Sequence, residues 1–387
     1  MANQISMKNA VVLAKVESAP GTEQAPSAAD AMLCTDVQID PLAGSAIDIA
    51  YVRPYYGGYP SMRVEDFVTC SITCDLVGNA TPVTPGAPYD ALLRACATAK
   101  TTLAAVASTS LVTGSTTTTL KLAASASSVD NFYVGQTVQV TGFPDRTIIG
   151  YVGSSKTATV HKAYATAPGT VTYTIAAASQ YTPVSTGLES CTLYFNQGGL
   201  RHKLIGARGN ASLDMSANGR PTIKFDMIGM FSPVADASDS ASYSGWGTPQ
   251  TINTANTWAI VDGKLSDGSA TGIQAMKWTM DFGNSVKHRQ LIGSESVPIT
   301  DRNSKGSVSV ELTTVAFNAW VERIRASTKG LLAVENGLTL GNIVNVWMPN
   351  AQLMDPKYSD SDGIVMLDMA YSAVPLVGND EFRLTFK

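Results

Sequence analysis

Charged side chains are scarce in this sequence. Lys, Arg, Asp and Glu make up 15% of its 387 residues, against about 25% in a typical soluble domain. Hydrophobic residues make up 44%, so the chain has the material for a core and is not expected to be disordered. The net charge of −4 argues against a general nucleic-acid binder, whose domain carries enough Lys and Arg to neutralise several phosphates.

Long apolar runs and paired cysteines are also missing. The apolar run 10–14 near the N-terminus is shorter than the roughly 7–15 residues of a secretory signal core. No stretch approaches the roughly 18 apolar residues that a transmembrane helix needs, so we expect no membrane segment. The five cysteines are odd in number and lie in apolar contexts, which predicts reduced, buried thiols: Cys34, Cys70, Cys74, Cys96 and Cys191.

Recognisable catalytic motifs are absent. The sequence has no G-x-S-x-G elbow, no phosphate-binding Gly-rich loop and no H-E-x-x-H. Of its three histidines, two stand in the basic triplets 201–203 and 287–289, which are typical of a solvated face or of pairing with a partner's carboxylates. Cys70 and Cys74 lack a second ligand pair at metal-binding spacing. We therefore predict a structural protein that is not an enzyme and has no cofactor.

Period-two alternation is the dominant pattern that is present. Every second residue is large and apolar in the segments 223–227, 276–282, 308–312 and 365–369, as in half-buried strands. Turn sequences at 218–219 and 303–306 predict hairpins, the second joining Ile299 to Val308. The fold class predicted is all-β, mostly antiparallel.

Two segments instead have helical spacing. Thr314 to Arg325 places Phe317, Trp320, Val321 and Ile324 on one face. Pro88 to Cys96 opens with a proline at a first-turn position. Both are short enough to flank a β-sandwich as lids.

A change in composition divides the chain. Residues 101–179 are rich in Ser, Thr and Ala but keep strand-like pieces at 134–140, 147–151 and 171–175. A disordered linker lacks such β-branched runs, so we predict a small inserted β domain on flexible joints.

Each well-defined strand carries one acid between apolar neighbours. The five acids are Asp214, Asp226, Asp281, Glu311 and Asp368. Because neighbouring side chains of a strand alternate between faces, these carboxylates are expected to project away from the core. They are either ordinary solubility residues or part of a surface that repels a polyanion.

The segment 51–60 is rich in tyrosine, proline and glycine and cannot be a regular central strand. Tyr and Arg are common anchors of protein–protein interfaces, so Tyr51, Arg53, Tyr55, Tyr56 and Tyr59 are candidate contacts between subunits. The alternative is a turn whose rings cover the edge of the protein's own core.

The order of several motifs resembles the tail tube (major tail) proteins of long-tailed, non-contractile bacteriophages. The similar segments cover about residues 8–100 and 180–387: 15–22 with 25–26, 52–57, 88–97, 199–209, 299–302 and 362–382. No single motif is specific, and the resemblance lies in their order.

The resemblance implies a two-sheet β-sandwich or barrel from residues 1–100 and 180–387, with an N-terminal arm at about 1–30 and a long hairpin loop at about 41–62. Subunits of this family form stacked homohexameric rings whose lumen carries double-stranded DNA into the host. The implied partners are further copies and the tape measure, tail tip and terminator proteins. The implied location is the virion tail, assembled in the bacterial cytoplasm, with 101–179 on the outside and the five acids in part facing the lumen.

Two other classes of protein stay open. One is a β-sandwich adhesin or carbohydrate-binding module that uses residues 101–179 for recognition. The other is a tail terminator or distal tail protein that forms single rings.

Overall fold

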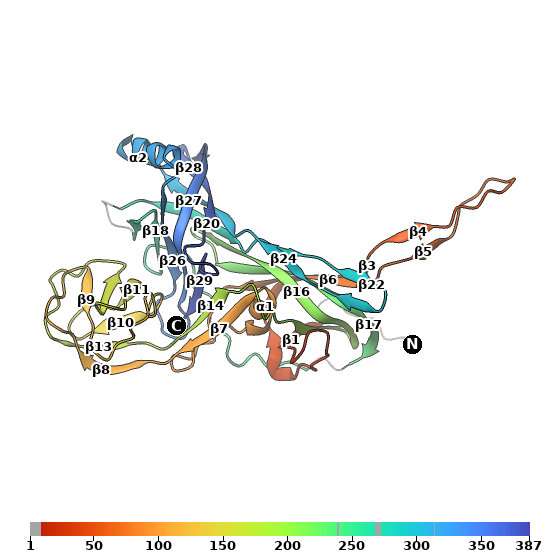
Figure 1. Ribbon diagram of the computed structural model, residues 1–387, viewed down its shortest axis with the longest axis horizontal. Helices are drawn as coiled ribbons and strands as arrows, with labels where there is room; N and C mark the ends of the chain where they lie inside the picture. Colours follow the sequence, from red (N-terminus) through yellow and green to blue (C-terminus); the bar gives the residue numbers. More distant parts are fainter. Residues whose placement is uncertain (1–8, 238–239, 268–271, 313) are drawn as a thin grey trace.

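The computed structural model describes residues 9–237, 240–267, 272–312 and 314–387, and it is almost entirely β (Figure 1). Strands hold 51% of the residues and helices 4%, which confirms the predicted all-β fold with short flanking helices. In the described residues no helix is long and apolar enough to span a membrane.

A run of antiparallel strands forms the main sheet, and its two ends are the strands β3 and β27. In spatial order it consists of β3 (Cys34–Ala43), β6 (Phe67–Asp75), β17 (Thr222–Asp236), β16 (Leu200–Ser216), β20 (Ala275–Asp281), β25 (Lys305–Glu311), β28 (Ile364–Ala373) and β27 (Val344–Ser361). The predicted strands at 223–227, 276–282, 308–312 and 365–369 all fall within it or end one residue beyond it.

Strand β16 bends out of the main sheet into a second one. There it pairs with β15 (Cys191–Gln197), β15 pairs with β1 (Ala10–Val16), and β1 pairs with β2 (Ala31–Met32). The short 3-10 turn η1 (Ala28–Asp30) directly precedes β2 in the chain. The register between β16 and β17 shifts between Ile205 and Arg208, and Gly206 lies there with φ 62°. A Cβ at Gly206 would meet Cε of Met230 at 2.8 Å, so this bend needs glycine.

The predicted N-terminal arm differs from what the structure shows. All seven residues of β1 pair with β15, and its central residues are buried. Residues 10–16 therefore belong to the sheet, because their apolar run has a place in the core. The first eight residues of the predicted arm lie outside the described residues.

Strand β27 also takes part in two sheets. Its first residues pair on both sides, giving the order β19 (Lys264–Ser266), β18 (Thr257–Val261), β26 (Lys329–Asn336), β27, β29 (Arg383–Phe386), β14 (Ala178–Pro183) and β7 (Thr98–Leu103). The long strands β16, β17 and β27 thus connect all three sheet regions into one network.

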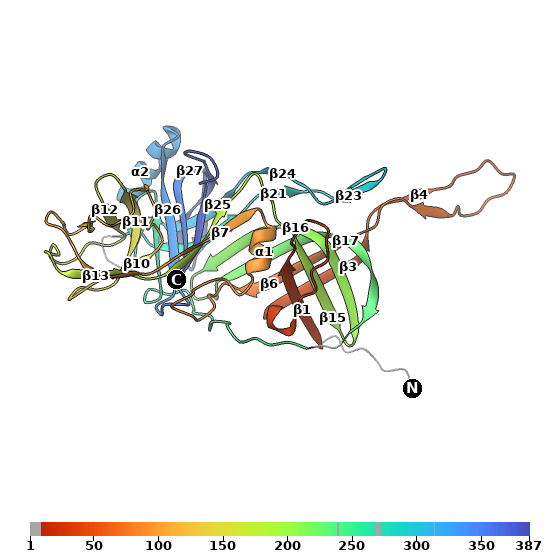
Figure 2. The same ribbon diagram turned by 60° about the horizontal axis from the view of Figure 1, so that its bottom comes forward.

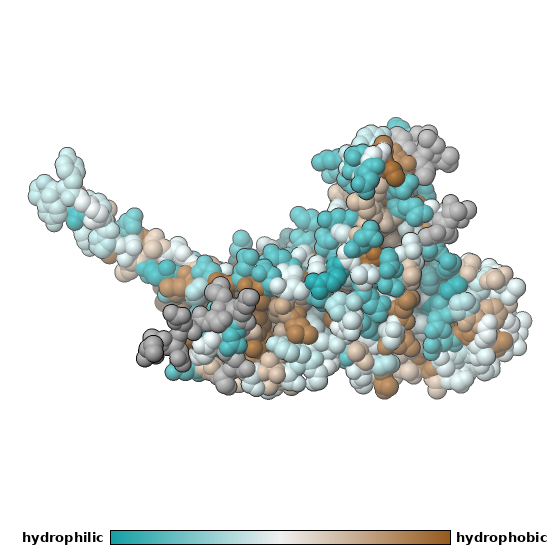
Figure 3. Space-filling view, turned by 180° about the vertical axis from the view of Figure 1, so that it is seen from behind, coloured by the Kyte–Doolittle hydropathy of each residue, from teal (hydrophilic) through white to brown (hydrophobic). Residues whose placement is uncertain are grey.

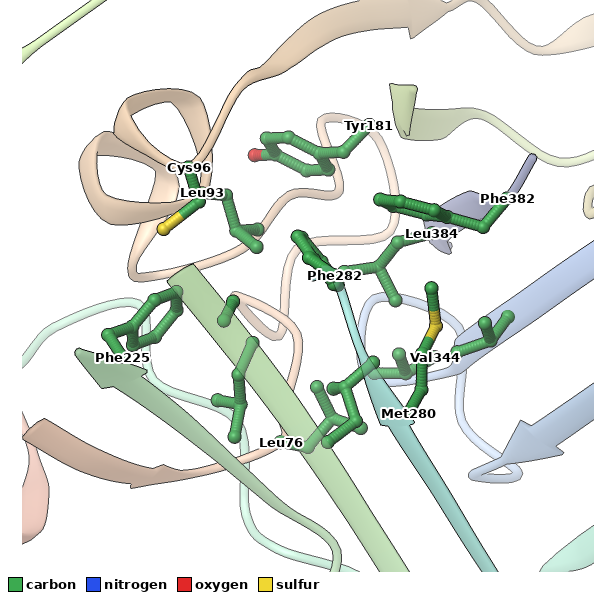
Figure 4. Packing of buried hydrophobic residues seen from close by; sticks show 14 of the residues in the cluster. Leu76, Leu93, Cys96, Tyr181, Phe225, Met280, Phe282, Val344, Phe382 and Leu384 are labelled. Carbon is green, nitrogen blue, oxygen red and sulfur yellow. The ribbon is translucent and has the colours of Figure 1, made fainter. Parts of the chain in front are cut away.

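The apolar faces of these sheets enclose one core (Figure 4). Phe225 of β17 and Met280 of β20 point into it, and Phe282 packs against Phe382 with ring centroids 4.5 Å apart. Helix α1 (Asp90–Ala95) closes this core with the fully buried Leu92 and Leu93. Helix α2 (Thr314–Arg325) buries Trp320, while Phe317 lies in the part of α2 whose side chains are outside the described residues.

Residues 106–175 form a separate six-stranded sheet, seen at the lower left of Figure 1. Its order is β8 (Val106–Ser110), β13 (Thr172–Ile175), β10 (Thr137–Val140), β11 (Arg146–Val152), β12 (Thr157–Val160) and β9 (Thr119–Lys121). The expected flexible joints are instead β7 and β14, which pair over six residues. Its apolar cluster also contains Ile260, Ala333 and Trp347 of the main body, so the inserted sheet is docked on that body.

One predicted hairpin is wrong. β24 (Ile299–Arg302) does not pair with β25 but with β21 (Asn284–Val286), while β25 continues along β20. The amide of Asn303 donates to the carbonyl of Gly283, so 303–306 is an irregular step within a longer hairpin. That hairpin ends in β22 (Arg289–Leu291) and β23 (Ser294–Ser296), where the turn lies.

Candidate assembly surfaces

The face of the main sheet that points away from the core is mostly polar, although Ile228, Met366 and Ala370 also lie on it. Strand alternation buries Val68, Cys70, Ile72 and Cys74 of β6 and turns Thr69, Ser71, Thr73 and Asp75 the other way. Cross-strand register extends that outer row without a break through Asp36, Thr73, Lys224, Ser212, Asp281, Lys305 and Ser372. We call this surface the polar face.

All five acids singled out in the sequence lie on strands of the polar face, on the side opposite most of its buried residues. Asp214 and Asp226 alternate with buried Leu213, Met215, Phe225 and Met227. Asp281 follows the same alternation in β20, Glu311 follows buried Val310 in β25, and Asp368 lies between buried Leu367 and Met369 in β28. Ser309 and Met366 are buried although they lie on the same side as Glu311 and Asp368. Only alternation was needed to find them, because it fixes which way a side chain points.

Lysines between these acids were missed by the sequence reasoning. Lys224 Nζ lies 3.0 Å from Asp226 Oδ1, and Lys277 Nζ lies 3.2 Å from Asp214 Oδ2. Lys305 is directly opposite Asp281, and Lys357 opposite Asp368. The same alternation that located the acids also places these lysines.

The polar face is therefore a mixed-charge surface with many hydroxyl and amide groups and a small acidic excess. Its other carboxylates are Asp36, Asp40 and Asp75, and Arg220 lies 3.2 Å from Asp75. About half of each side chain in the pairs Lys224–Asp226 and Lys277–Asp214 is exposed, so these pairs contribute little stability. Such a face has neither a continuous basic surface that would bind a polyanion nor a uniformly acidic surface that would repel one.

Both edges of the main sheet are open within the described part of the chain. β3 pairs with β6 alone, and residues 357–361 of β27 pair with β28 alone. Unpaired edges attract further strands, and β3 carries Pro41, a residue that edge strands tolerate. The outer sides of β3 and β27 are places where a neighbouring chain can extend the sheet.

A long arm projects from the body next to β3. It runs through residues 44–66, and its strands β4 (Ala46–Asp48) and β5 (Ser61–Arg63) pair only with each other. Figures 1 and 3 show it standing clear of the rest of the molecule. All four arm tyrosines are exposed, Tyr56 at 106%, so their rings do not cover the protein's own core.

Arg53 organises the far end of the arm. Its guanidinium donates to the carbonyls of Gly57 and Gly58 at 2.9 and 2.6 Å. The guanidinium carbon Cζ of Arg53 lies 5.0 Å from the ring centroid of Tyr55 and 4.3 Å from that of Tyr59, in cation–π contact with both rings. The five candidate contact residues thus lie together on one exposed element, with Arg53 holding the tip.

Burial shifts the pKa of two of the three histidines. Burial lowers the pKa of His161 to about 4, and its Nδ1 accepts a hydrogen bond from the amide of Thr147. Burial also lowers the pKa of His202. Within the described ranges, His, Cys, Asp and Glu form no group able to hold a metal ion, and the five cysteines are free thiols.

The chain matches no protein-family model and no curated protein sequence.

Proposed function

We propose that this protein is the subunit of a hollow tube of stacked homohexameric rings, the tail tube of a long-tailed, non-contractile bacteriophage, through which double-stranded DNA passes. The observation that carries the proposal is the main sheet itself, with a polar outer face and two open edges. A sheet with open edges closes into a barrel when each subunit adds its edge to the next.

In the proposed ring, β3 of one subunit lies beside residues 357–361 of β27 in the neighbouring subunit. This arrangement satisfies the backbone groups that both edges leave unpaired. It also turns the polar face toward the lumen and leaves the inserted sheet 106–175, at the opposite end of the molecule from the arm, for the outside (Figure 2).

The arm supplies the contact between rings. Tyr51, Tyr55, Tyr56 and Tyr59 carry large exposed ring surface, and buried aromatic anchors dominate the free energy of protein interfaces. Other copies of this chain are the proposed partners, followed by the tape measure, tip and terminator proteins of the tail. The protein then acts as a conduit and not as an enzyme, in virions assembled in the bacterial cytoplasm.

Sedimentation velocity and negative-stain microscopy of the purified full chain test this proposal. Rings and stacks that grow with protein concentration are expected. A monodisperse monomer at high concentration would contradict the tube and favour a binding module. Single rings that never stack would favour a terminator or distal tail protein.

Reversing charge on the polar face is expected to create DNA binding. The wild-type face lacks a basic track, so we expect no binding to double-stranded DNA near physiological salt. In the variant D214K/D226K/D281K the basic side chains dominate that face, and affinity is expected to fall with salt at a log–log slope of about −0.9 per phosphate contact. Fluorescence anisotropy at several salt concentrations measures it.

A control variant with the same change in net charge separates location from total charge. D145K/E322K/D360K places its three lysines off the polar face, at exposed positions of the inserted sheet, α2 and β27. Equal DNA binding by both variants, or clear binding by the wild type, would show that the polar face has no special relation to DNA.

A further inference from the structure

The imidazole of His288 lies at the root of the arm, between two carboxylates from different segments. Its Nδ1 is 3.0 Å from Oε1 of Glu65, which follows β5, and its Nε2 is 2.9 Å from Oε1 of Glu295 in β23. The ring stacks on Phe67 of β6 with centroids 4.8 Å apart, and the side chain is 2% exposed. Figure 2 shows β23 beside the root of the arm.

With both carboxylates ionised, this geometry requires a charged imidazole. An ionised carboxylate only accepts hydrogen bonds, whereas a neutral imidazole has a single N–H to donate. Both contacts are therefore hydrogen bonds only when His288 carries a proton on each nitrogen. Loss of one proton leaves either Glu65 or Glu295 facing a lone pair.

The two carboxylates beside His288 both favour its charged form. Burial disfavours its charged form, but hydrogen bonds and charge from Glu295 and Glu65 outweigh burial and raise the pKa of His288 above its ordinary value. Phe67 is the neutral group packed on the ring, and Lys287 and Arg289 are its neighbours in sequence.

A second contact at the arm root does not depend on this proton. Arg63 lies 2.5 Å from Asp66 and donates to the carbonyls of Leu42 and Ala43. Arginine stays protonated throughout the neutral range. The root therefore keeps one attachment when His288 loses its proton.

We propose that His288 is a proton-dependent latch that fixes the root of the arm to the hairpin β22–β23. A histidine whose folded-state pKa is raised stabilises the latched state below its unfolded pKa and ceases to do so as pH rises through the folded pKa. The arm is thus held below the ordinary pKa of histidine and released as pH rises through the raised pKa of His288. This inference concerns the single chain and does not rest on ring formation.

An NMR titration of the three histidines in the full wild-type chain tests the protonation. We expect His288 to titrate above about 6.5, the ordinary value for histidine. E65Q and E295Q should each lower that pKa. A His288 that titrates at or below the ordinary value in the wild type would overturn the latch, and this measurement needs no variant to fold.

Hydrogen exchange tests the coupling to the arm. The measured quantity is the protection factor, which removes the intrinsic pH dependence of amide exchange. The protection factors of residues 61–67 should fall roughly tenfold between pH 6 and pH 9, because a charged hydrogen bond is lost. H288Q should abolish this pH dependence, and the matched control H202Q should keep it. Protection that is equally pH-dependent in H288Q, or independent of pH in the wild type, would contradict the proposal.

Discussion

Removing the arm is expected to abolish contact between rings and to leave the subunit folded. In the cross-strand register Ala46 is opposite Arg63, so residues 47–62 can be replaced by a two-residue Asn-Gly turn without disturbing that pair. The arm belongs to no other sheet and places no side chain in the core. We therefore expect the free energy of unfolding to change by no more than about 0.5 kcal/mol.

The effect on assembly should be much larger. Loss of two or more aromatic anchors removes about 4 kcal/mol or more of interface free energy, which is a factor of about 1,000 in the stacking constant. Sedimentation velocity should then show single rings or monomers where the wild type forms stacks.

A milder variant identifies which part of the arm carries the contact. Y55A/Y56A keeps the hairpin and removes two exposed rings, and it should weaken stacking in the same direction. I292A is a matched control, because Ile292 is just as exposed on the separate hairpin β22–β23. Stacks of normal length in the armless protein would show that the arm is not the contact between rings.

Replacing Glu335 by glutamine is expected to cost about 3–5 kcal/mol of stability, as when one member of a buried ion pair is lost. Nζ of Lys387 lies 2.8 Å from Glu335 Oε2 and donates to Thr147 Oγ1 at 2.7 Å. Lys387 is fully buried and Glu335 nearly so. Burial lowers the pKa of Lys387, while Glu335 acts against that shift, so the variant leaves an ammonium group without its counter-charge.

The same substitution should loosen the inserted sheet. Glu335 also accepts hydrogen bonds from Thr147 at 2.8 Å and from Trp258 at 3.1 Å. Thr147 belongs to β11, whereas Glu335 and Trp258 belong to the main body. Urea unfolding measures the loss of stability, and hydrogen exchange of β11 measures undocking.

A double variant distinguishes a lost charge pair from a general disturbance. E335Q/K387M removes both charges and should recover most of the stability, because no unpaired ion remains buried. E322Q breaks the exposed pair with Arg325 and should change stability by no more than about 1 kcal/mol. Equal losses in E335Q and in the double variant would contradict the account of this contact.

Local patterns predicted those features that depend on local geometry. Alternation in β16, β17 and β20 fixed the direction of Asp214, Asp226 and Asp281, because a strand has only two faces. Helical spacing likewise predicted α2, because residues three and four apart lie on one face of a helix. Asn303 misled the prediction, since its turn-like sequence serves a step within one long hairpin.

Contacts between segments that are distant in sequence could not be predicted from the sequence. Thr147 and Glu335 are 188 residues apart in sequence, and nothing in either neighbourhood marks them as partners. The contact of His288 with Glu65 has the same character, because the basic triplet 287–289 gives no hint of which carboxylates face it. The exposure of the arm likewise depends on the absence of any packed neighbour, which composition alone cannot determine.

Cryo-electron microscopy of the assembled wild-type protein tests the central claim most directly. We predict stacked six-fold rings in which β3 lies beside β27 of the next subunit, the polar face lines the lumen and the arm reaches an adjacent ring. An assembly with the polar face on the outside, or with arms that contact no other ring, would contradict the proposal.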